Sequence, residues 1–237
     1  MMKDESFLKP CPDPFSEEAS LIADEAAQVA ARTVRSDLVK RAVDVTGASL
    51  LIVFLLPVFL LITASILLLD GGPVYFRHQR IGRNDREFGC LKFRTMRKDG
   101  DKILAQWLAD HPDQRREWNE TQKLRKDPRV HVVGRLLRKS SLDELPQLFN
   151  VLAGQMSLVG PRPVVRDELP RYGAYVPIYL SLRPGITGLW QVSGRNNTTY
   201  DERVAFDVDY AARRTLALDL GILFRTARVV LTGYGAY

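Results

Sequence analysis

The longest apolar stretch of the chain covers residues 45–69 and contains no charged side chain. A helix needs about 20 predominantly apolar residues to span the hydrocarbon core of a bilayer. Helices in the core of a soluble protein are seldom this long without a polar face. The pattern therefore predicts that this segment is a helix buried in a membrane.

Two features of this segment leave its path through the membrane open. Basic side chains lie on both sides of it, and because positive charge marks the cytoplasmic side, both ends are expected there. Pro57 lies near the middle, where a proline removes a backbone hydrogen bond and bends a helix. A straight transmembrane span and a re-entrant helix that bends at Pro57 are both compatible with the sequence. The flanking basic residues are Arg35, Lys40 and Arg41 before the segment, and Arg77, His78, Arg80, Arg83 and Arg86 after it.

The pattern after the membrane segment predicts two strands followed by helices. Residues 73–96, PVYFRHQRIGRNDREFGCLKFRTM, predict two strands about a polar turn at residues 83–86. Residues 99 to about 124 are expected to form one helix. Ser141 is expected to begin the next helix, which ends in the loop around Gly160. The residues expected on the buried face of the first of these helices are Ile103, Leu104, Trp107 and Leu108.

A stripe of apolar residues near the C-terminus predicts a further amphipathic helix. Arg225 and Arg228 lie off this stripe. Such a helix can pack on the protein core, or lie in the bilayer interface with its arginines toward the headgroups, and both alternatives remain open. The stripe consists of Leu220, Leu223, Phe224, Ala227, Val230 and Leu231.

The first 35 residues have a different composition. Residues 1 to about 20 are rich in Pro, Asp and Glu and poor in large apolar side chains, which predicts a disordered tail. The Ala-rich residues 20–35 predict a helix. No secretory signal peptide is expected, because the charge is negative where such a peptide is positive.

Charge and composition narrow the classes of partner. The chain has 237 residues, with 34 Lys and Arg against 28 Asp and Glu, which gives a net charge of +6. This excess favours an anionic partner, namely nucleic acid, anionic lipid or a phosphorylated substrate. No helix-turn-helix, RRM or KH pattern is visible, so no nucleic acid is expected. Neither the two cysteines nor the three histidines have metal-ligand spacing, which leaves carboxylates as ligands for a hard cation.

The adjacent carboxylates Asp143 and Glu144 have a structural and a chemical interpretation. Ser141 and Glu144 form the S-x-x-E pattern of a capping box, and acidic residues favour the first turn of a helix. An Asp at a helix N-terminus would be held ionised beside backbone N–H groups that bind anions. Such an Asp could be a nucleophile or a ligand for Mg²⁺. Upstream arginines, Arg138 among them, could neutralise a phosphate.

Two basic motifs are candidate phosphate sites. Arg162 lies between the prolines of GPRP, and a guanidinium on a stiff corner suits bidentate recognition of phosphate. The structural alternative is an ion pair with Asp167 or Glu168. Lys92 and Arg94 would share one face of a strand, which is commonly no more than a solvated basic face.

Asp207 and Asp209 match the D-x-D pattern by which many nucleotide-sugar glycosyltransferases hold a metal ion. A pattern of three residues arises often by chance, and no run of parallel strands of the kind such enzymes use precedes this one. A metal site at these two residues is therefore a minor alternative.

Three long blocks follow the Pro-bearing apolar segment, namely KFRTM, LRKSSLDELPQLFNVLAGQMSLVGPRPV and RPGITGLWQVSGRN. In this order they resemble the bacterial sugar transferase family, the polyprenyl-phosphate hexose-1-phosphate transferases or monotopic phosphoglycosyl transferases. The resemblance covers residues 36–237 and points to the short members that initiate exopolysaccharide synthesis, including galactosyl-phosphate transferases.

The resemblance implies a reaction and a location. A hexose 1-phosphate, of galactose or glucose, passes from a UDP-sugar to undecaprenyl phosphate, and UMP is released. The expected partners are these two substrates, membrane lipid and a possible second copy in a homodimer. The expected place is the cytoplasmic face of the bacterial inner membrane, in monotopic form. The alternatives are a membrane-associated glycosyltransferase that releases UDP and a non-catalytic membrane scaffold.

The resemblance also implies a fold and its division. An α/β (α+β) fold is expected, mainly helical with a small β-hairpin or sheet. A re-entrant helix–break–helix would anchor a cytosolic catalytic domain that carries interfacial amphipathic helices. The expected parts are a variable N-terminal tail at residues 1–35, a re-entrant membrane helix kinked at Pro57 at residues 36–72, and a catalytic domain at residues 73–237.

Carried over by motif, Asp143 is the nucleophile, Glu144 is its dyad partner and Mg²⁺ is expected at Asp143. The family's Ser-Pro at the helix break is replaced here by Leu56-Pro57, which removes a hydroxyl that could satisfy a freed carbonyl. The residues expected to bind phosphate or donor substrate are Lys92, Arg94, Arg138, Arg162, Pro163, Gln191, Gly194 and Arg195.

Overall fold

A computed structural model describes residues 34–121, 124, 126–194 and 198–232 of the chain. In this part the polypeptide is mainly helical with a small β content, as expected. It divides into two compact units whose segments alternate along the sequence. The first unit holds the described residues up to Phe54, Arg77–Leu91 and the residues from Gln147 onward. The second unit holds Leu55–Phe76 and Lys92–Pro146.

The apolar segment forms two helices, α2 (Val34–Phe54) and α3 (Leu56–Asp70). Pro57 occupies the first turn of α3, where the missing N–H of a proline interrupts no hydrogen bond within the helix. Among the described residues no single helix is long and apolar enough to cross a bilayer, whereas the bent pair satisfies length and composition together. A span by one unbroken helix is therefore wrong, whereas passage of the bent pair across a membrane and its return to the same face both stay predictions.

The predicted strands on either side of a polar turn are confirmed. Strand β1 (Tyr75–Ile81) pairs with β2 (Glu87–Phe93), and the short turn η2 (Arg83–Asp85) joins them. Asn84 adopts a positive φ of 58° in this turn, a conformation that asparagine tolerates better than most residues.

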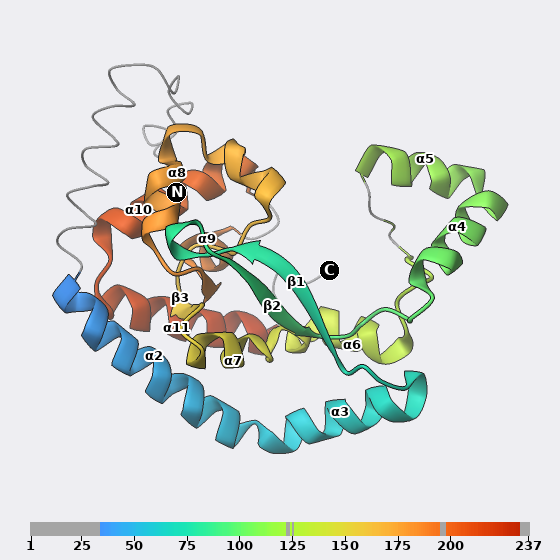
Figure 1. Cartoon of the computed structure of the whole chain (residues 1–237), viewed down its shortest axis with the longest axis horizontal. Helices are drawn as coiled ribbons and strands as arrows, with labels where there is room; N and C mark the ends of the chain where they lie inside the picture. The colour runs from blue at the N-terminus through green and yellow to red at the C-terminus, as the bar shows by residue number, and fades with distance from the viewer. Residues whose placement is uncertain (1–33, 122–123, 125, 195–197, 233–237) are drawn as a thin grey trace. The chain divides into compact units, whose positions relative to one another are not determined.

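In the first unit, α7 (Gln147–Leu152) and β3 (Ser157–Val159) lie against α2 (Figure 1). Strand β3 pairs in parallel with β4 (Gly185–Thr187). The buried Asp44 of α2 accepts the N–H of Leu158 at 3.0 Å, and Lys40 donates to Asp219 at 2.7 Å. These two contacts fasten α2 to β3 and to α11 (Leu216–Thr232).

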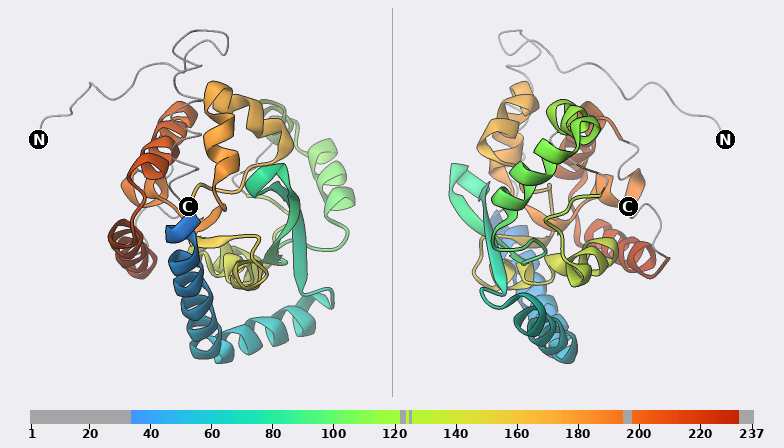
Figure 2. Two further views of the ribbon diagram at one scale, coloured as in Figure 1. Left: turned by 60° about the vertical axis from the view of Figure 1, so that its left-hand side comes forward. Right: turned by 90° about the vertical axis from the view of Figure 1, so that its right-hand side faces the viewer.

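The core of the first unit surrounds two tyrosines. The elements η4 (Arg166–Tyr175), α8 (Val176–Ser181) and α10 (Tyr200–Arg213) pack on one another (Figure 2), and α9 (Leu189–Ser193) packs on α10. The rings of Tyr172 and Tyr179 lie 4.9 Å apart between their centroids. The buried residues of this cluster are Ile81, Val164, Leu169, Tyr172, Tyr179 and Val204.

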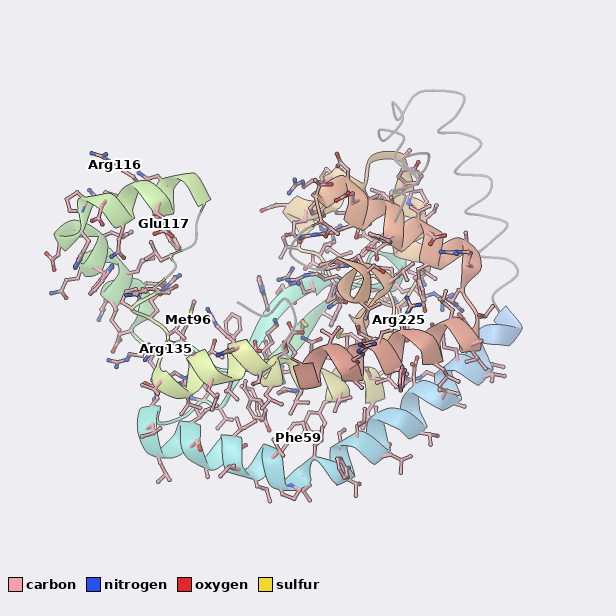
Figure 3. The ribbon with its side chains drawn as sticks, turned by 180° about the vertical axis from the view of Figure 1, so that it is seen from behind. Phe59, Met96, Arg116, Glu117, Arg135 and Arg225 are labelled. Atoms are coloured by element: carbon pink, nitrogen blue, oxygen red, sulfur yellow. The ribbon has the colours of Figure 1, made fainter. Side chains whose placement is uncertain are left out.

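The predicted C-terminal helix is present as α11, but its buried face differs from the predicted stripe. Ile222 is buried, whereas Leu220 and Phe224 are 61% and 75% exposed. The helix thus packs on its unit through a neighbouring face and leaves part of the apolar stripe uncovered. Arg225, labelled in Figure 3, is exposed on the same helix. Contact of this surface with a bilayer stays a prediction.

The helix expected at residues 99–124 is interrupted. The second unit forms α4 (Gly100–Asp110) and α5 (Pro112–Thr121), because Pro112 begins a new helix where it cannot continue the old one. Leu104, Leu108 and Leu124 are buried together, with Trp107 and Trp118 packed against them. The spacing predicts the buried face of α4 correctly, but the prediction of one continuous helix through Pro112 is wrong.

The strand end is anchored to α3 by aromatic contacts in the second unit. Phe59, labelled in Figure 3, has its ring centroid 5.6 Å from that of Phe93 at the end of β2. Tyr75 stacks on the same ring at 5.5 Å. Phe93 is 1% exposed, so this cluster fixes the path of the chain into the residues that follow β2.

Asn150 links β2 to α7 inside the first unit, although it is only 2% exposed. Its Nδ2 donates to the carbonyl of Gly89 at 2.8 Å and to Gln155 Oε1 at 2.7 Å. Its Oδ1 accepts the N–H of Leu91 at 2.9 Å. A single side chain therefore satisfies two backbone groups of a strand and stabilises the start of the following loop.

Replacing Asn150 with Ala should lower the free energy of unfolding by about 2 kcal/mol, since two buried backbone groups lose their partners. The midpoint of thermal unfolding in detergent, compared with the wild type, measures this. The exposed Asn119→Ala serves as the matched control and should leave the midpoint unchanged. Equal midpoints for Asn150→Ala and the wild type would show that these hydrogen bonds contribute little.

Candidate active site

The two adjacent carboxylates follow a sharp end of helix rather than opening one. Helix α6 (Val132–Ser140) stops where Ser141 adopts a left-handed conformation, with φ 58° and ψ 16°. Its N–H donates to the carbonyls of Arg138 and Leu137. A 3₁₀ turn, η3 (Leu142–Glu144), then carries both carboxylates, and α7 begins only at Gln147. The predicted helix start at Ser141 is wrong.

The predicted capping box is also absent. The side chain of Ser141 makes no capping hydrogen bond, and the carboxylate of Glu144 points to Lys92 instead. The Lys92 Nζ and Glu144 Oε1 atoms are 2.6 Å apart, and the side chains are 25% and 28% exposed. A tertiary ion pair has replaced the local hydrogen bond that the pattern favours.

A close approach of backbone brings α6 to the end of β2. A Cβ on Gly134 would lie 2.2 Å from the carbonyl oxygen of Thr95, so only glycine fits there. His131, which is 7% exposed, accepts the N–H of Gly134 through Nδ1 at 2.9 Å and donates from Nε2 to the carbonyl of Arg94 at 3.1 Å. Arg138 Nε donates to Thr95 Oγ1 at 2.9 Å. His131 is a single histidine without a partner at ligand spacing, so the sequence pattern gave no signal for this role.

Asp143 has an unusual electrostatic environment. Burial raises the pKa of its carboxyl to about 6, against the charge of Lys92, which lowers the pKa. The charge of Glu144 raises the pKa further, and that of Arg138 lowers it. The predicted influence of an α-helix N-terminus is wrong, because Asp143 lies in a 3₁₀ turn of 3 residues and the largest effect on its pKa is the loss of water. Nearby cations keep the carboxylate accessible near neutral pH.

Arg94 lies two residues after Lys92, but its contacts hold the end of α3. Its Nη2 donates to the carboxylate of Asp70 at 2.6 Å and to the carbonyls of Asp70 and Gly71. Arg94 is 7% exposed, and its Nε and Nη1 atoms have no hydrogen-bond partner within the described part of the chain. These contacts are structural, and substrate binding by Arg94 stays a prediction.

The remaining predicted residues belong to the first unit. Arg162 is exposed on the GPRP corner, with its guanidinium 6.0 Å from the centroid of the Trp190 ring. Pro163 accepts a hydrogen bond from Arg80 through its carbonyl. Gln191 lies in α9 with a buried Oε1, and Gly194 follows that helix. Arg195 lies outside the described residues.

An ion pair of Arg162 with Asp167 or Glu168 was the structural alternative, but Glu168 pairs with a different arginine. Glu168 pairs with Arg80 at 3.5 Å, and its carboxylate also accepts the N–H of Val165 at 3.2 Å. The structure thus brings Lys92, Arg138, Asp143 and Glu144 together in one unit, and Arg162, Pro163, Gln191 and Gly194 are described with the other.

The D-x-D alternative receives no support from the geometry. Asp207 is buried in α10, where the hydroxyl of Tyr172 donates to it at 2.8 Å and burial raises its pKa to about 7. Asp209 pairs with Arg213 on the exposed side of the helix. Within the described ranges no group of three or more His, Cys, Asp and Glu side chains could hold a metal ion.

A magnesium ion is nevertheless compatible with the second unit. Mg²⁺ commonly uses only one or two carboxylates together with water and substrate phosphates. Asp143 offers carboxylate oxygens, Glu144 follows it in the turn η3, and the burial of Asp143 would favour a neutralising hard cation. The donor types of Asp143 and Glu144 thus permit Mg²⁺, and its binding stays a prediction.

Comparison with known proteins gives this arrangement its class. Residues 35–233 match the bacterial sugar transferase family, and the chain belongs to that family. It is 51% identical over 200 residues to the exopolysaccharide production protein ExoY of Rhizobium meliloti, covering 84% of this chain and 88% of that protein.

Other relatives have names that specify a reaction. The chain is 50% identical over 202 residues to the undecaprenyl-phosphate galactose phosphotransferase of Salmonella typhimurium. This match covers 85% of the chain but only 42% of the longer relative. It is also 41% identical over 214 residues to the UDP-glucose:undecaprenyl-phosphate glucose-1-phosphate transferase of Caulobacter vibrioides, covering 86% of this chain and 74% of that protein.

The pKa of Asp143 provides a direct test of the site in protein free of divalent cations. The carboxylate form should be lost as the pH falls through about 6. Lys92→Gln should move this titration to higher pH, because a stabilising positive charge is removed. Glu144→Gln should move it to lower pH, because a repelling negative charge is removed.

The carboxyl ¹³C chemical shift of Asp143, followed against pH, measures both changes. Lys102→Gln, an exposed lysine of α4, is the control and should leave the titration in place. A shift to lower pH in Lys92→Gln would contradict the described environment.

Proposed function

We propose that this protein transfers a hexose 1-phosphate from a UDP-sugar to undecaprenyl phosphate and releases UMP. The observation that carries the proposal is a partly buried carboxyl, Asp143, with its pKa raised to about 6 and the cations Lys92 and Arg138 acting on it. The names of two relatives, which specify undecaprenyl-phosphate sugar phosphotransferases, support the substrate class. Galactose and glucose are the sugars in those names.

The first step is an attack by Asp143 on the sugar-bearing β-phosphorus of the donor. A carboxylate oxygen bonds to that phosphorus, the bond from the phosphorus to the bridging oxygen breaks, and UMP leaves with this oxygen. The hexose phosphate remains on Asp143 as a mixed acyl phosphate. A covalent intermediate divides one difficult displacement into two easier ones.

The second step returns the enzyme to its starting state. An oxygen of undecaprenyl phosphate attacks the same phosphorus, the bond to Asp143 breaks, and undecaprenyl-diphospho-sugar leaves. The acceptor phosphate is already ionised near neutral pH, so no base has to remove a proton before it attacks, and the weakly basic carboxylate of Asp143 leaves readily. The intermediate makes the two substrates react in turn rather than together.

The surrounding side chains have distinct tasks in this scheme. Burial strips water from Asp143, which leaves its oxygen less well solvated and more reactive toward phosphorus. Lys92 and Arg138 offset the negative charge of the approaching phosphates. Glu144 holds Lys92 in place through the 2.6 Å ion pair. A magnesium ion held by Asp143 with substrate phosphates would supply further charge neutralisation.

Helices α2 and α3, buried in the membrane in this proposal, determine where the reaction takes place. The acceptor's long hydrocarbon tail stays in the bilayer, so the enzyme must work at the level of the headgroups. The described parts of α2 and α3 expose many large apolar side chains, which suits burial in lipid. We place the protein on the cytoplasmic face of the bacterial inner membrane, where UDP-sugars are made. The most exposed of these side chains are Leu38, Leu50, Val53, Phe54, Leu61, Leu68 and Leu69.

Nucleotide release without acceptor tests the covalent step. Wild-type protein mixed with the correct UDP-sugar, Mg²⁺ and no lipid acceptor should release about one UMP per enzyme, since each carboxylate reacts once. Asp143→Asn should release none and should show no transfer with acceptor. Product nucleotides are separated by chromatography, and the adduct is located by mass spectrometry.

The exposed Asp101→Asn, which removes a carboxylate from α4, is the matched control and should behave as the wild type. Release of UDP in place of UMP would favour a glycosyltransferase. Full turnover by Asp143→Asn would rule out the proposed nucleophile, and the absence of nucleotide release from a panel of UDP-sugars would rule out the function.

A further inference from the structure

Helix α3 ends on an acidic residue in an unfavourable place. Asp70 is its last residue and directly follows the leucines at positions 67–69. The C-terminal end of a helix carries partial negative charge, so a carboxylate there is repelled unless a cation lies beside it. The Asp70 side chain is only 16% exposed, and burial adds to this cost. The end of α3 therefore needs a compensating positive group.

Arg94 supplies this group from the position that follows β2. Its Nη2 donates to the Asp70 carboxylate at 2.6 Å, to the carbonyl of the same residue at 3.1 Å and to the carbonyl of Gly71. The last carbonyls of a helix have no partner within it, and a basic side chain can satisfy them. The main-chain N–H of Arg94 donates to the carbonyl of Val74 at 2.8 Å. Side chain and main chain thus fasten this arginine to the segment that leaves α3.

The residues on either side of Arg94 contact the candidate active site within the same unit. Two residues before it, Lys92 Nζ lies 2.6 Å from Glu144 Oε1 in the turn η3. One residue after it, Thr95 Oγ1 accepts a hydrogen bond from Arg138 Nε at 2.9 Å. Polar contacts therefore connect the end of α3, through Arg94 and its neighbours, to the turn that carries the candidate nucleophile.

Apolar contacts alone would define this connection less closely. The ring of Phe93 contacts those of Phe59 and Tyr75, but the hydrophobic effect is not directional. Charged hydrogen bonds from one guanidinium nitrogen to three oxygens depend on distance and angle. One residue along a helix corresponds to a rise of about 1.5 Å. The contact of Asp70 with Arg94 therefore fixes the place along α3 at which the residues after β2 are attached.

The two substrates of the proposed reaction differ in how much this place matters to them. A UDP-sugar dissolves in water and can approach the site freely. The phosphate of undecaprenyl phosphate is held near the bilayer surface by a tail that lies among the same lipids as α3 in the proposed location. A misplacement of about 1 Å between reacting groups can lower a rate about a hundredfold. The step with the acceptor therefore depends on the position of the site relative to α3, and the step with the donor does not.

We propose that Asp70 is a positioning residue for the lipid acceptor, which acts through Arg94 to keep the site at the depth of the acceptor phosphate. The inference rests on the proposed function and on the membrane location proposed with it. Arg94 then serves the acceptor step through its contact with the end of α3, and not by binding the donor. Neither side chain has to touch a substrate in this role.

The two half-reactions separate this role from others. The full-length chain in nanodiscs is assayed for UMP release from the UDP-sugar without acceptor, and for transfer to undecaprenyl phosphate in the same nanodisc. Asp70→Asn keeps the shape of the side chain and removes its charge. It should lower kcat/KM for undecaprenyl phosphate about tenfold or more, because the site and the acceptor phosphate no longer meet at one depth. The rate and amount of UMP release without acceptor should equal those of the wild type.

A short-chain prenyl phosphate that dissolves in water gives a second comparison. Because the depth of this acceptor is not fixed, Asp70→Asn should transfer sugar phosphate to it nearly as well as the wild type does. If the wild type does not use the short-chain acceptor, UMP release alone serves as the reference.

Three further variants complete the design. Asp70→Glu restores a carboxylate and should recover most of the transfer to undecaprenyl phosphate. Arg94→Lys keeps the charge but loses the planar donor group, so it should lower the same kcat/KM, and combining it with Asp70→Asn should add little. Asp110→Asn removes the exposed carboxylate that ends α4 in the same unit and should behave as the wild type in every assay.

Undiminished transfer to undecaprenyl phosphate by a folded Asp70→Asn protein would overturn the inference. An equal loss of UMP release and of transfer would also overturn it, because that is the pattern of a merely structural role. Slower UMP release by Arg94→Lys alone would assign this arginine to the donor and contradict its indirect role. If Asp70→Asn does not fold, Arg94→Lys decides by the same assays: loss of the acceptor step alone supports the inference, and loss of UMP release overturns it.

Hydrogen–deuterium exchange distinguishes a failure of this inference from a failure of the proposed function. Asp70→Asn should speed exchange at the N–H of Arg94, which bonds to Val74, whether or not the protein is active. Unchanged exchange would show that Asp70 does not hold this connection, and would overturn the inference alone. A wild type that releases no nucleotide and transfers nothing would overturn the proposed function, and the role in the acceptor step with it.

Discussion

A carboxylate that is to attack a phosphate must be partly withdrawn from water and must still carry its charge. These demands oppose each other, because burial favours the protonated acid. In the second unit of this chain they are reconciled by Lys92 and Arg138, whose charges act on Asp143 against the effect of desolvation. Close by in the same unit, Gly134 allows α6 to approach the residues that follow β2, and His131 bonds to the backbones of Arg94 and Gly134. These contacts hold Arg138 beside Thr95.

The sequence was informative where a local rule had no competitor. The hairpin was predicted because a polar turn separates two predicted strands, and the break in the apolar segment was predicted because a proline cannot continue a helix that has already begun. The same rule operates at Pro112, where the helical spacing of the apolar residues before it concealed the break. The buried face of α4 survived this error, since Leu104 and Leu108 lie before the break.

The sequence was misleading where a distant residue competed for the same group. The S-x-x-E pattern predicts a local hydrogen bond to Glu144, but Lys92, which lies 52 positions away along the chain, forms an ion pair with it. Asp207 matches a metal motif, yet the phenol of Tyr172 engages it inside the core. The role of His131 depends on a contact with the carbonyl of Arg94, which no spacing within the sequence reveals. Local patterns cannot report contacts that only the folded chain creates.

The anchoring of α2 has a consequence for the membrane location proposed above. Asp44 is bonded to the amide of Leu158, and Lys40 is bonded to Asp219, immediately before the uncharged stretch begins. Sliding the helix by one residue would rotate it by about 100° and carry both side chains away from their partners. The register of α2 is thereby set by its contacts with β3 and α11, and not by the thickness of a surrounding bilayer. In the proposed membrane location, adjustment to a thicker or thinner leaflet would have to come from the apolar segment after Asp44. The position of Asp44 itself is fixed by its bond to the amide of Leu158.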